Sequence, residues 1–285
     1  MNTTAAREFV EAQLKNAYTP NELRVIVNAL FEDLLGLSSG WLIRADALTP
    51  NQMQRIHQAV DRMIQGEPLQ YVTGIAHFYK MILHVSPAVL IPRPETEELV
   101  SWADDELAER IANRGEALTI MDIGTGSGCI PIALSALYPS LHYYGMDISE
   151  DALAVAATNA KRYSSTVQWI HDDMTSPQKN YPEFDLIISN PPYIPFREAA
   201  VLDRQVIEYE PHLALFEPDD EPLKYYEAVI RFAKRTLRAE GVVMVEMHQD
   251  YAQRVLSLFQ SYFTHTELRK DISGHERMLK AGGIV

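Results

Sequence analysis

The stretch that decides the fold is Thr119-Ile120-Met121-Asp122-Ile123, followed by Gly124-Thr125-Gly126-Ser127-Gly128 and an apolar run from Ile130 to Leu137. This order predicts a buried strand, a glycine-rich turn and a helix. Glycines are needed where a ligand lies against bare backbone, because a Cβ atom would block its approach. We therefore expect a ligand at this turn, at the carboxyl edge of a parallel sheet.

Strands and helices alternate from Leu118 onward. The pattern predicts further strands at residues 141–146, 167–170, 184–189 and 242–246, and further helices at residues 152–161, 225–237 and 252–259. Such alternation is typical of a mostly parallel, doubly wound sheet with helices on both faces. The expected fold class is therefore α/β and Rossmann-like.

Acidic residues follow the next two predicted strands. Asp147 ends the first of them, about 20 residues beyond the glycine turn, where this fold places the carboxylate that binds ribose hydroxyls. A cap for the following helix is the alternative interpretation of Asp147. Asp172-Asp173-Met174 closes the second strand at the same edge, where it could contact an adenine amino group or form a solvated turn. A nicotinamide dinucleotide fold would share Asp147, although the glycines here are spaced GxGxG.

The tetrapeptide Asn190-Pro191-Pro192-Tyr193 follows an apolar strand and so falls at the same sheet edge. An amide nitrogen is a poor nucleophile, so an enzyme must orient it and stabilise the charge that develops on attack. The Asn190 side-chain oxygen and the Pro191 carbonyl are suited to accept hydrogen bonds from its two N–H groups. Consecutive prolines make that wall rigid, and Tyr193 is suited to stack on a flat substrate group.

An isolated Asn-Pro-Pro could equally be a proline-rich turn. Its place after a strand, downstream of the glycine turn, favours catalysis instead. The two motifs together predict an S-adenosylmethionine-dependent methyltransferase that acts on a planar amide or amino nitrogen. Such an enzyme needs no general base, because the attacked nitrogen becomes acidic and loses its proton to solvent.

The first third of the chain predicts helices. Thr19-Pro20-Asn21-Glu22 and Thr49-Pro50-Asn51-Gln52 are capping-box sequences, and apolar residues follow each at helical spacing. Short β-type runs then occupy residues 78–85 and 88–91 around Ser86-Pro87, which predicts a hairpin. We expect a helical bundle over residues 1–75, a β-hairpin linker over residues 76–92 and a methyltransferase domain over residues 93–285.

The composition restricts the cellular compartment and the partners expected for this protein. The formal net charge of −14 disfavours nucleic acid, because phosphate binding requires basic surface. Cys129 is the single cysteine, the nine histidines show no metal-ligand spacing, and the first residues carry Arg7 and Glu8 without an apolar core. We therefore expect a cytoplasmic protein with no metal site and no membrane segment.

The chain resembles the HemK/PrmC family, the protein-(glutamine-N5) methyltransferases that modify peptide chain release factors. The resemblance covers nearly the whole chain and rests on Leu90-Ile91-Pro92-Arg93-Pro94-Glu95-Thr96-Glu97, on Asp122 to Gly128, on Asp147 and on Asn190 to Tyr193. It implies a substrate glutamine in a Gly-Gly-Gln motif, held by Asn190, Pro191, Pro192 and Tyr193, and a helical bundle that docks the release factor. It also implies that the cofactor S-adenosylmethionine is bound by Gly124, Thr125, Gly126, Ser127, Gly128, Asp147, Asp173, Met174 and Asn190.

The chain departs from the family pattern at Met174, at Glu221-Pro222-Leu223 and at His248. Two other substrates for the same chemistry stay open at this stage. One is the exocyclic amino group of adenine or guanine in nucleic acid, which would require a basic groove. The other is a glutamine of a ribosomal protein. A binding module that has lost activity is a third alternative, disfavoured by the intact Asn190 and glycine turn.

Overall fold

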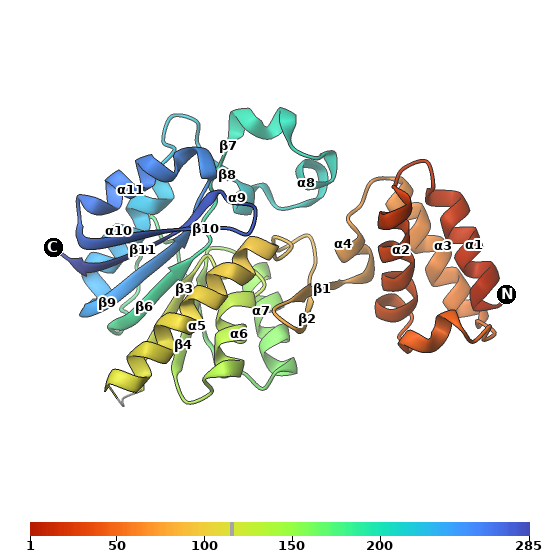
Figure 1. Ribbon diagram of the computed structural model, residues 1–285, viewed down its shortest axis with the longest axis horizontal. Helices are drawn as coiled ribbons and strands as arrows, with labels where there is room; N and C mark the ends of the chain where they lie inside the picture. The colour runs from red at the N-terminus through yellow and green to blue at the C-terminus, as the bar shows by residue number, and fades with distance from the viewer. Residues whose placement is uncertain (115–116) are drawn as a thin grey trace. The chain divides into compact units, whose positions relative to one another are not determined.

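The computed structural model describes residues 1–114 and 117–285 (Figure 1). Contacts between Cα atoms divide the chain into two compact units. The first contains Met1–Ala76, Val85–Pro87 and Asp203–Tyr209, and the second contains His77–His84, Ala88–Leu202 and Glu210–Val285. None of the helices in the described residues is long and apolar enough to cross a membrane.

The first unit is helical. Its elements are α1 (Thr3–Leu14), α2 (Pro20–Ala29), the π-helical turn η1 (Leu30–Leu34), the 3-10 turn η2 (Ser39–Leu42), α3 (Pro50–Ile64), α4 (Leu69–Thr73) and α8 (Arg204–Tyr209). Both predicted capping boxes are present: the Glu22 and Gln52 backbone N–H groups donate to the hydroxyls of Thr19 and Thr49, at 3.4 and 3.2 Å. The apolar stripes behind them form one buried cluster that includes Phe31, Trp41 and Ile56.

The hairpin lies earlier in the chain than the sequence predicts. Its strands are β1 (Ile75–Phe78) and β2 (Met81–His84), and residues 88–91 form no strand, so the predicted turn at Ser86-Pro87 is wrong. The turn is Tyr79-Lys80, both left-handed with φ of 46° and 63°, which suits a two-residue hairpin turn. Such a turn normally uses glycine or asparagine, so this sequence carried no signal for it.

The second unit is built on a seven-stranded sheet with the order β10-β11-β9-β6-β3-β4-β5. The strands are β3 (Thr119–Ile123), β4 (His142–Asp147), β5 (Gln168–His171), β6 (Phe184–Ser189), β9 (Leu237–Glu246), β10 (Phe263–Lys270) and β11 (Glu276–Ile284). Strands β9, β6, β3, β4 and β5 are parallel, whereas β10 and β11 pair antiparallel at one edge. The predicted mostly parallel fold is confirmed, and the antiparallel edge was not predicted.

Helices cover both faces of this sheet (Figure 1). On one face α5 (Pro94–Arg114), α6 (Cys129–Leu137) and α7 (Glu150–Arg162) pack over one apolar cluster, and on the other α10 (Lys224–Thr236) and α11 (Ala252–Gln260) pack over a second. The chain runs from β3 to β4 and β5 on one side and returns to β6 on the other. This reversal is the switch point at which such sheets bind ligands, at the carboxyl ends of the strands.

Short elements cross the carboxyl edge between β6 and α10. They are β7 (Ile194–Pro195), the 3-10 helix η3 (Phe196–Val201), α9 (His212–Leu215) and β8 (Phe216–Glu217), while the 3-10 turn η4 (Gln249–Tyr251) precedes α11. Strands β7 and β8 pair in parallel as a separate two-stranded sheet. None of these elements was predicted from the sequence.

Gly128 ends the glycine turn and fixes how closely α6 approaches the sheet. Its φ is +77°, and an added Cβ would lie 2.9 Å from the Trp169 ring, 3.0 Å from Ile132 and 3.1 Å from Ala156. Gly126, two residues earlier, has φ of +52° and no atom within 4 Å of such a Cβ. Gly128 is therefore required by both backbone conformation and packing, whereas Gly126 is required by conformation and leaves open space.

We expect Gly128→Ala to lower the free energy of unfolding by about 2–4 kcal/mol, because left-handed strain and overpacking add. The matched variant Gly126→Ala carries only the backbone term, roughly 1–2 kcal/mol. Urea denaturation followed by circular dichroism, without cofactor, measures both. Equal losses in the two variants would mean that the contact with Trp169 is not tight.

Candidate active site

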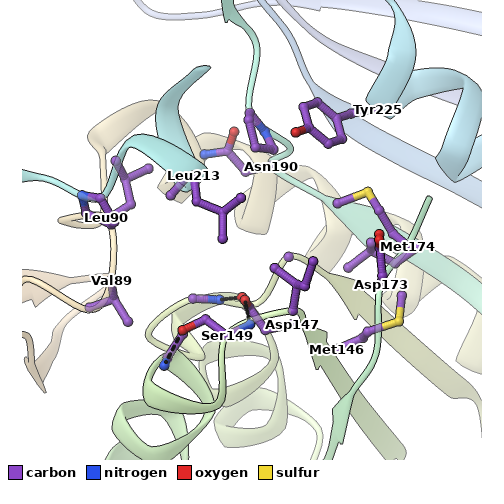
Figure 2. Close-up of a pocket in the computed structure, with 18 of the residues that line it drawn as sticks. Val89, Leu90, Met146, Asp147, Ser149, Asp173, Met174, Asn190, Leu213 and Tyr225 are labelled. Carbon is purple, nitrogen blue, oxygen red and sulfur yellow. Dashed lines mark hydrogen bonds between the residues drawn. The ribbon is translucent and has the colours of Figure 1, made fainter. Parts of the chain in front are cut away.

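A cavity of about 280 Å³ lies at the carboxyl ends of the parallel strands (Figure 2). Figure 2 shows Asn190 and Asp147 on opposite walls, with Val89 and Leu90 on one side and Met174 and Tyr225 on the other. The strand ends and the turns after them contribute Ile123, Gly124, Gly126, Met146, Asp147, Ile148, Ser149, Asp172, Asp173, Met174, Thr175, Asn190 and Pro192. The cavity therefore brings together most of the residues singled out in the sequence.

The glycine turn forms the floor of the cavity. The N–H groups of Gly124 and Thr125 donate to the Met146 carbonyl at 2.8 and 2.9 Å, which fixes the turn to strand β4. A Cβ on Gly126 would meet nothing within 4 Å, and one on Gly124 only the methyl of Met174 at 3.7 Å. The missing Cβ atoms therefore leave a cradle in which a ligand fits against the backbone.

Asp147 links the turn to the start of α7. Its two carboxylate oxygens accept from the Gly126 N–H at 2.8 Å and from the Ser149 N–H at 3.0 Å. Burial raises the pKa of Asp147, and these backbone donors act against that rise. Ser149, rather than Asp147, caps α7, because its hydroxyl accepts from the Ala152 N–H at 3.1 Å. Each Asp147 oxygen keeps a lone pair for a ligand hydroxyl.

The acids after β5 have separate environments. Asp172 accepts from the Tyr181 hydroxyl at 2.5 Å and from the Gln178 and Lys179 N–H groups, so it holds the following loop in place. Burial raises the pKa of Asp172, but these hydrogen bonds outweigh it and leave the value lowered. Asp173 accepts from the Thr175 N–H and hydroxyl, both at 2.7 Å, and lies beside Met174 on the cavity wall.

Some residues of the tetrapeptide line the cavity and others do not. Asn190 and Pro192 line the cavity, while Pro191 is buried and does not line it. The Tyr193 hydroxyl donates to the Glu246 carboxylate at 2.8 Å, and the Asn190 side-chain NH₂ donates to the Thr96 hydroxyl at 3.0 Å. Among the predicted turn residues, Thr125, Ser127 and Gly128 also lie outside the lining. Thr125 and Ser127 are buried behind it.

Two further segments complete the cavity wall, and the sequence analysis did not assign them a role there. They are Ala88, Val89 and Leu90, and Pro211, Leu213 and Ala214. The buried carboxylate of Glu210 joins the two segments, accepting from the Ile91 N–H at 3.1 Å and from the Arg93 guanidinium at 2.5 Å. Arg93 belongs to the quoted stretch Leu90 to Glu97, but no spacing in the sequence connects it to Glu210. Lys224 and Tyr225, at the start of α10, were also missed.

Asp122 lies behind the glycine turn and is fully buried. Within the described residues neither of its carboxylate oxygens has a hydrogen-bond partner. Burial raises the pKa of Asp122 to about 7, the nearby Thr125 hydroxyl acts against this rise, and the Asp147 carboxylate adds to it. The carboxyl of Asp122 is therefore held in a state that favours its proton.

Two family models match the chain. One, described as the methyltransferase small domain, matches residues 102–209, and the other, described as the PrmC N-terminal domain, matches residues 5–74. The glycine cradle, Asp147, Asp173 and Asn190 all lie within the residues that the first model matches. The protein is thus an S-adenosylmethionine-dependent methyltransferase, as its motifs predicted.

Relatives of similar length define the family. The release factor glutamine methyltransferase of Flavobacterium psychrophilum is 39% identical over 276 residues, which cover 96% of each chain. That of Bacteroides thetaiotaomicron is 32% identical over 277 residues, covering 96% of this chain and 97% of the relative. The chain belongs to the release factor glutamine methyltransferase family.

A solved structure shares the fold. The hMettl16 catalytic domain, in complex with MAT2A 3′UTR hairpin 6, has a TM-score of 0.54 and 14% sequence identity, and the match covers 83% of both chains. The likeness concerns the arrangement of helices and strands, because the sequences have diverged widely. The predicted fold class, cofactor and family are confirmed by these matches together.

The buried carboxyl of Asp122 predicts a pH-dependent stability. Its pKa is about 7 in the folded protein and 3.8 in the ordinary carboxyl, so its neutral form stabilises the fold fully below about pH 4. This stabilisation is lost as the pH rises through about 7. Asp122→Asn stays neutral and should gain stability over the unmodified protein between pH 5 and 8, by on the order of 2–4 kcal/mol.

Urea midpoints at several pH values, measured without cofactor, test this expectation. Asp151→Asn, at an exposed position in the first turn of α7, is the matched control and should show no such change. A constant difference between Asp122→Asn and the unmodified protein across this pH range would contradict the buried proton.

Proposed function

We propose that the protein transfers a methyl group from S-adenosylmethionine to the side-chain nitrogen N5 of the glutamine in the Gly-Gly-Gln motif of peptide chain release factors. One observation carries the proposal: the Asn190 carboxamide lines the cavity on the wall opposite Asp147, and its NH₂ donates to the Thr96 hydroxyl. Its oxygen makes no hydrogen bond within the described residues. An acceptor held at this place is what a primary amide substrate requires.

The chemistry divides between the cofactor and the chain. S-adenosylmethionine supplies an electrophilic methyl on its sulfonium centre. The Asn190 oxygen accepts from one N–H group of the substrate amide, which orients its nitrogen and stabilises the charge gained on attack. We assign the second N–H group to the Pro191 main-chain carbonyl, although Pro191 does not line the cavity. Pro191 and Pro192 keep this wall rigid. The proton then leaves the acidified nitrogen to solvent.

We assign the cofactor to the turn Gly124 to Gly128, to Asp147 and to the Asp173-Met174 wall, with Asn190 between cofactor and substrate. The open space at Gly124 and Gly126 supports this assignment for the turn. The free lone pairs of Asp147 suit ribose hydroxyls, and Met174 offers an apolar surface to the adenine. We also assign Tyr193 to the substrate side, although it does not line the cavity, and its bond to Glu246 supports a role in fixing the tetrapeptide.

We also propose that the helical bundle of residues 1–75 docks the release factor, joined by the linker of residues 76–92 to the catalytic domain of residues 93–285. The match of residues 5–74 to the PrmC N-terminal domain supports this role. We infer a protein substrate rather than nucleic acid, since the net charge is −14. The single cysteine supports action in the reducing cytoplasm.

The proposed substrate is tested with labelled S-adenosylmethionine and four acceptors: a release factor, the same factor with its Gly-Gly-Gln glutamine changed to glutamate, a ribosomal protein and duplex DNA. We expect label only on the unmodified release factor. Label on DNA or on the ribosomal protein, with none on the release-factor glutamine, would refute the proposed substrate.

Asn190→Ala should lower turnover about 100- to 1,000-fold, because an oriented acceptor in the transition state is lost. Its thermal unfolding should match that of the unmodified protein, since Asn190 is only partly buried. Steady-state methylation of the release factor measures the effect. Turnover equal to that of the unmodified protein would remove Asn190 from the reaction.

Asp147→Ala should weaken the binding of S-adenosylmethionine about 10- to 100-fold, because it removes a hydroxyl acceptor and frees the Gly126 N–H. Titration calorimetry measures the dissociation constant. Asp151→Ala removes the same charge from the exposed start of α7 and serves as the control. An unchanged dissociation constant for Asp147→Ala would contradict the ribose assignment.

A further inference from the structure

Behind the tetrapeptide lies a chain of hydrogen bonds that the sequence did not predict. Thr96, in the first turn of α5, is 3% exposed, and Glu246, the last residue of β9, is fully buried. The Thr96 hydroxyl donates to Glu246 Oε2 at 2.7 Å and accepts from the Asn190 NH₂ at 3.0 Å. The Tyr193 hydroxyl donates to Glu246 Oε1 at 2.8 Å. One buried carboxyl group therefore connects to both ends of the tetrapeptide.

Which group donates in each of these hydrogen bonds follows from the protons that the side chains carry. A carboxylate accepts only, and a threonine hydroxyl has a single proton to give. When Glu246 is ionised, that proton points to Oε2, and Thr96 offers Asn190 only a lone pair. The group of Asn190 that meets Thr96 must then be its NH₂. The carboxamide oxygen is left for the substrate side.

This direction matters because the two orientations of a carboxamide have the same shape. Rotation by half a turn would present the NH₂ of Asn190, a donor, to the NH₂ of the substrate glutamine, also a donor. Packing alone distinguishes the two orientations poorly, since oxygen and NH₂ occupy similar volumes. Only the hydrogen-bond partners select one of them.

The surroundings of Glu246 act on its charge in both directions. Burial raises the pKa of Glu246, the Thr96 and Tyr193 hydroxyls lower it, Glu95 raises it and Arg277 lowers it, and the balance leaves the pKa above its ordinary value. Burial and the Glu246 carboxylate raise the pKa of Tyr193 well above its ordinary value, so Tyr193 keeps its proton and remains a donor.

We propose that Thr96 and Glu246 are positioning residues that set the direction of the Asn190 carboxamide, so that its oxygen faces the substrate nitrogen. The inference rests on the proposed function for its consequence in turnover. Its structural part, the polarity of the bond between Thr96 and Asn190, is independent of which substrate is methylated. Neither residue lines the cavity, so their effect passes through Asn190.

Replacing Thr96 by valine tests the proposal, because valine keeps the branched shape and removes the hydroxyl. We expect kcat to fall about 10- to 100-fold, as for a misoriented catalytic group, while KM for S-adenosylmethionine stays unchanged. The thermal unfolding midpoint should fall by a few degrees, because the buried Glu246 carboxylate loses a donor. Thr96→Ser, which restores the hydroxyl, should recover most of the turnover. Unchanged kcat in Thr96→Val, or a serine variant as slow as the valine variant, would overturn the proposal.

A second measurement needs no substrate. The side-chain ¹⁵N–H resonances of Asn190, assigned by their absence in Asn190→Ala, should exchange slowly with water and should exchange faster in Thr96→Val. Glu246→Gln, in which the new amide donates as well as accepts, should also speed this exchange. Equal exchange in all three proteins would overturn the proposal. If the unmodified protein failed to methylate release factors, the proposed function would be refuted. The exchange measurement would still test the orientation of the Asn190 carboxamide.

Discussion

The close approach of α6 to the sheet is the constraint on which the site depends. Trp169 of β5 fills the space that a Cβ would take at Gly128 and at Gly145, where an added Cβ would lie 2.9 and 2.5 Å from its ring. The helix starts close to the strands, and the turn before it reverses tightly, with positive φ at Gly124, Gly126 and Gly128. It bends back with its N–H groups directed at the Met146 carbonyl and at Asp147.

The path of this turn also determines the polarity of the cavity. The N–H groups of the turn donate to neighbouring strand groups, so the wall offered to a ligand is mainly bare glycine, apolar side chains and carboxylates. Ser149, Thr175 and Asn190 add neutral polar groups to it. Asp147 and Asp173 face the cavity, and Lys224 is its only basic lining residue among those the structure describes. An acidic, largely apolar pocket suits a cofactor that carries a positive sulfonium and adenosine hydroxyls, and it disfavours phosphate.

Features fixed by local rules could be predicted from the sequence. The strand-turn-helix at residues 119–137 and the acid at Asp147 follow from apolar patterning and strand ends, and both capping boxes are local signals. The hairpin was misplaced because Tyr79-Lys80 adopts left-handed conformations without glycine. Its strands also depend on distant support: Ile82 exchanges hydrogen bonds with the Tyr163 hydroxyl, 81 residues away.

The missed parts of the site are those that long-range contacts create. Glu210 meets Arg93 across 117 residues, and Thr96 meets Glu246 across 150, distances at which a single sequence carries no pairing signal. The role foreseen for Tyr193 was a stacking surface, yet its hydroxyl is bound to a carboxylate that only the folded sheet brings close. The sequence patterns identified residues that line the cavity, but not the residues that hold them in position.

The Glu246 carboxyl group, which binds both Thr96 and Tyr193, also determines when the site is complete during synthesis of the chain. Because chains emerge from the amino end, the cofactor turn, Asp147 and the tetrapeptide are all available before β9 has been made. Until residue 246 leaves the ribosome, Thr96 has no carboxylate to fix the direction of its hydroxyl proton, so it can meet either end of the Asn190 carboxamide. A nascent chain that already contains every motif visible in the sequence would thus still lack an oriented acceptor, and full competence would arrive only with the final strands of the sheet.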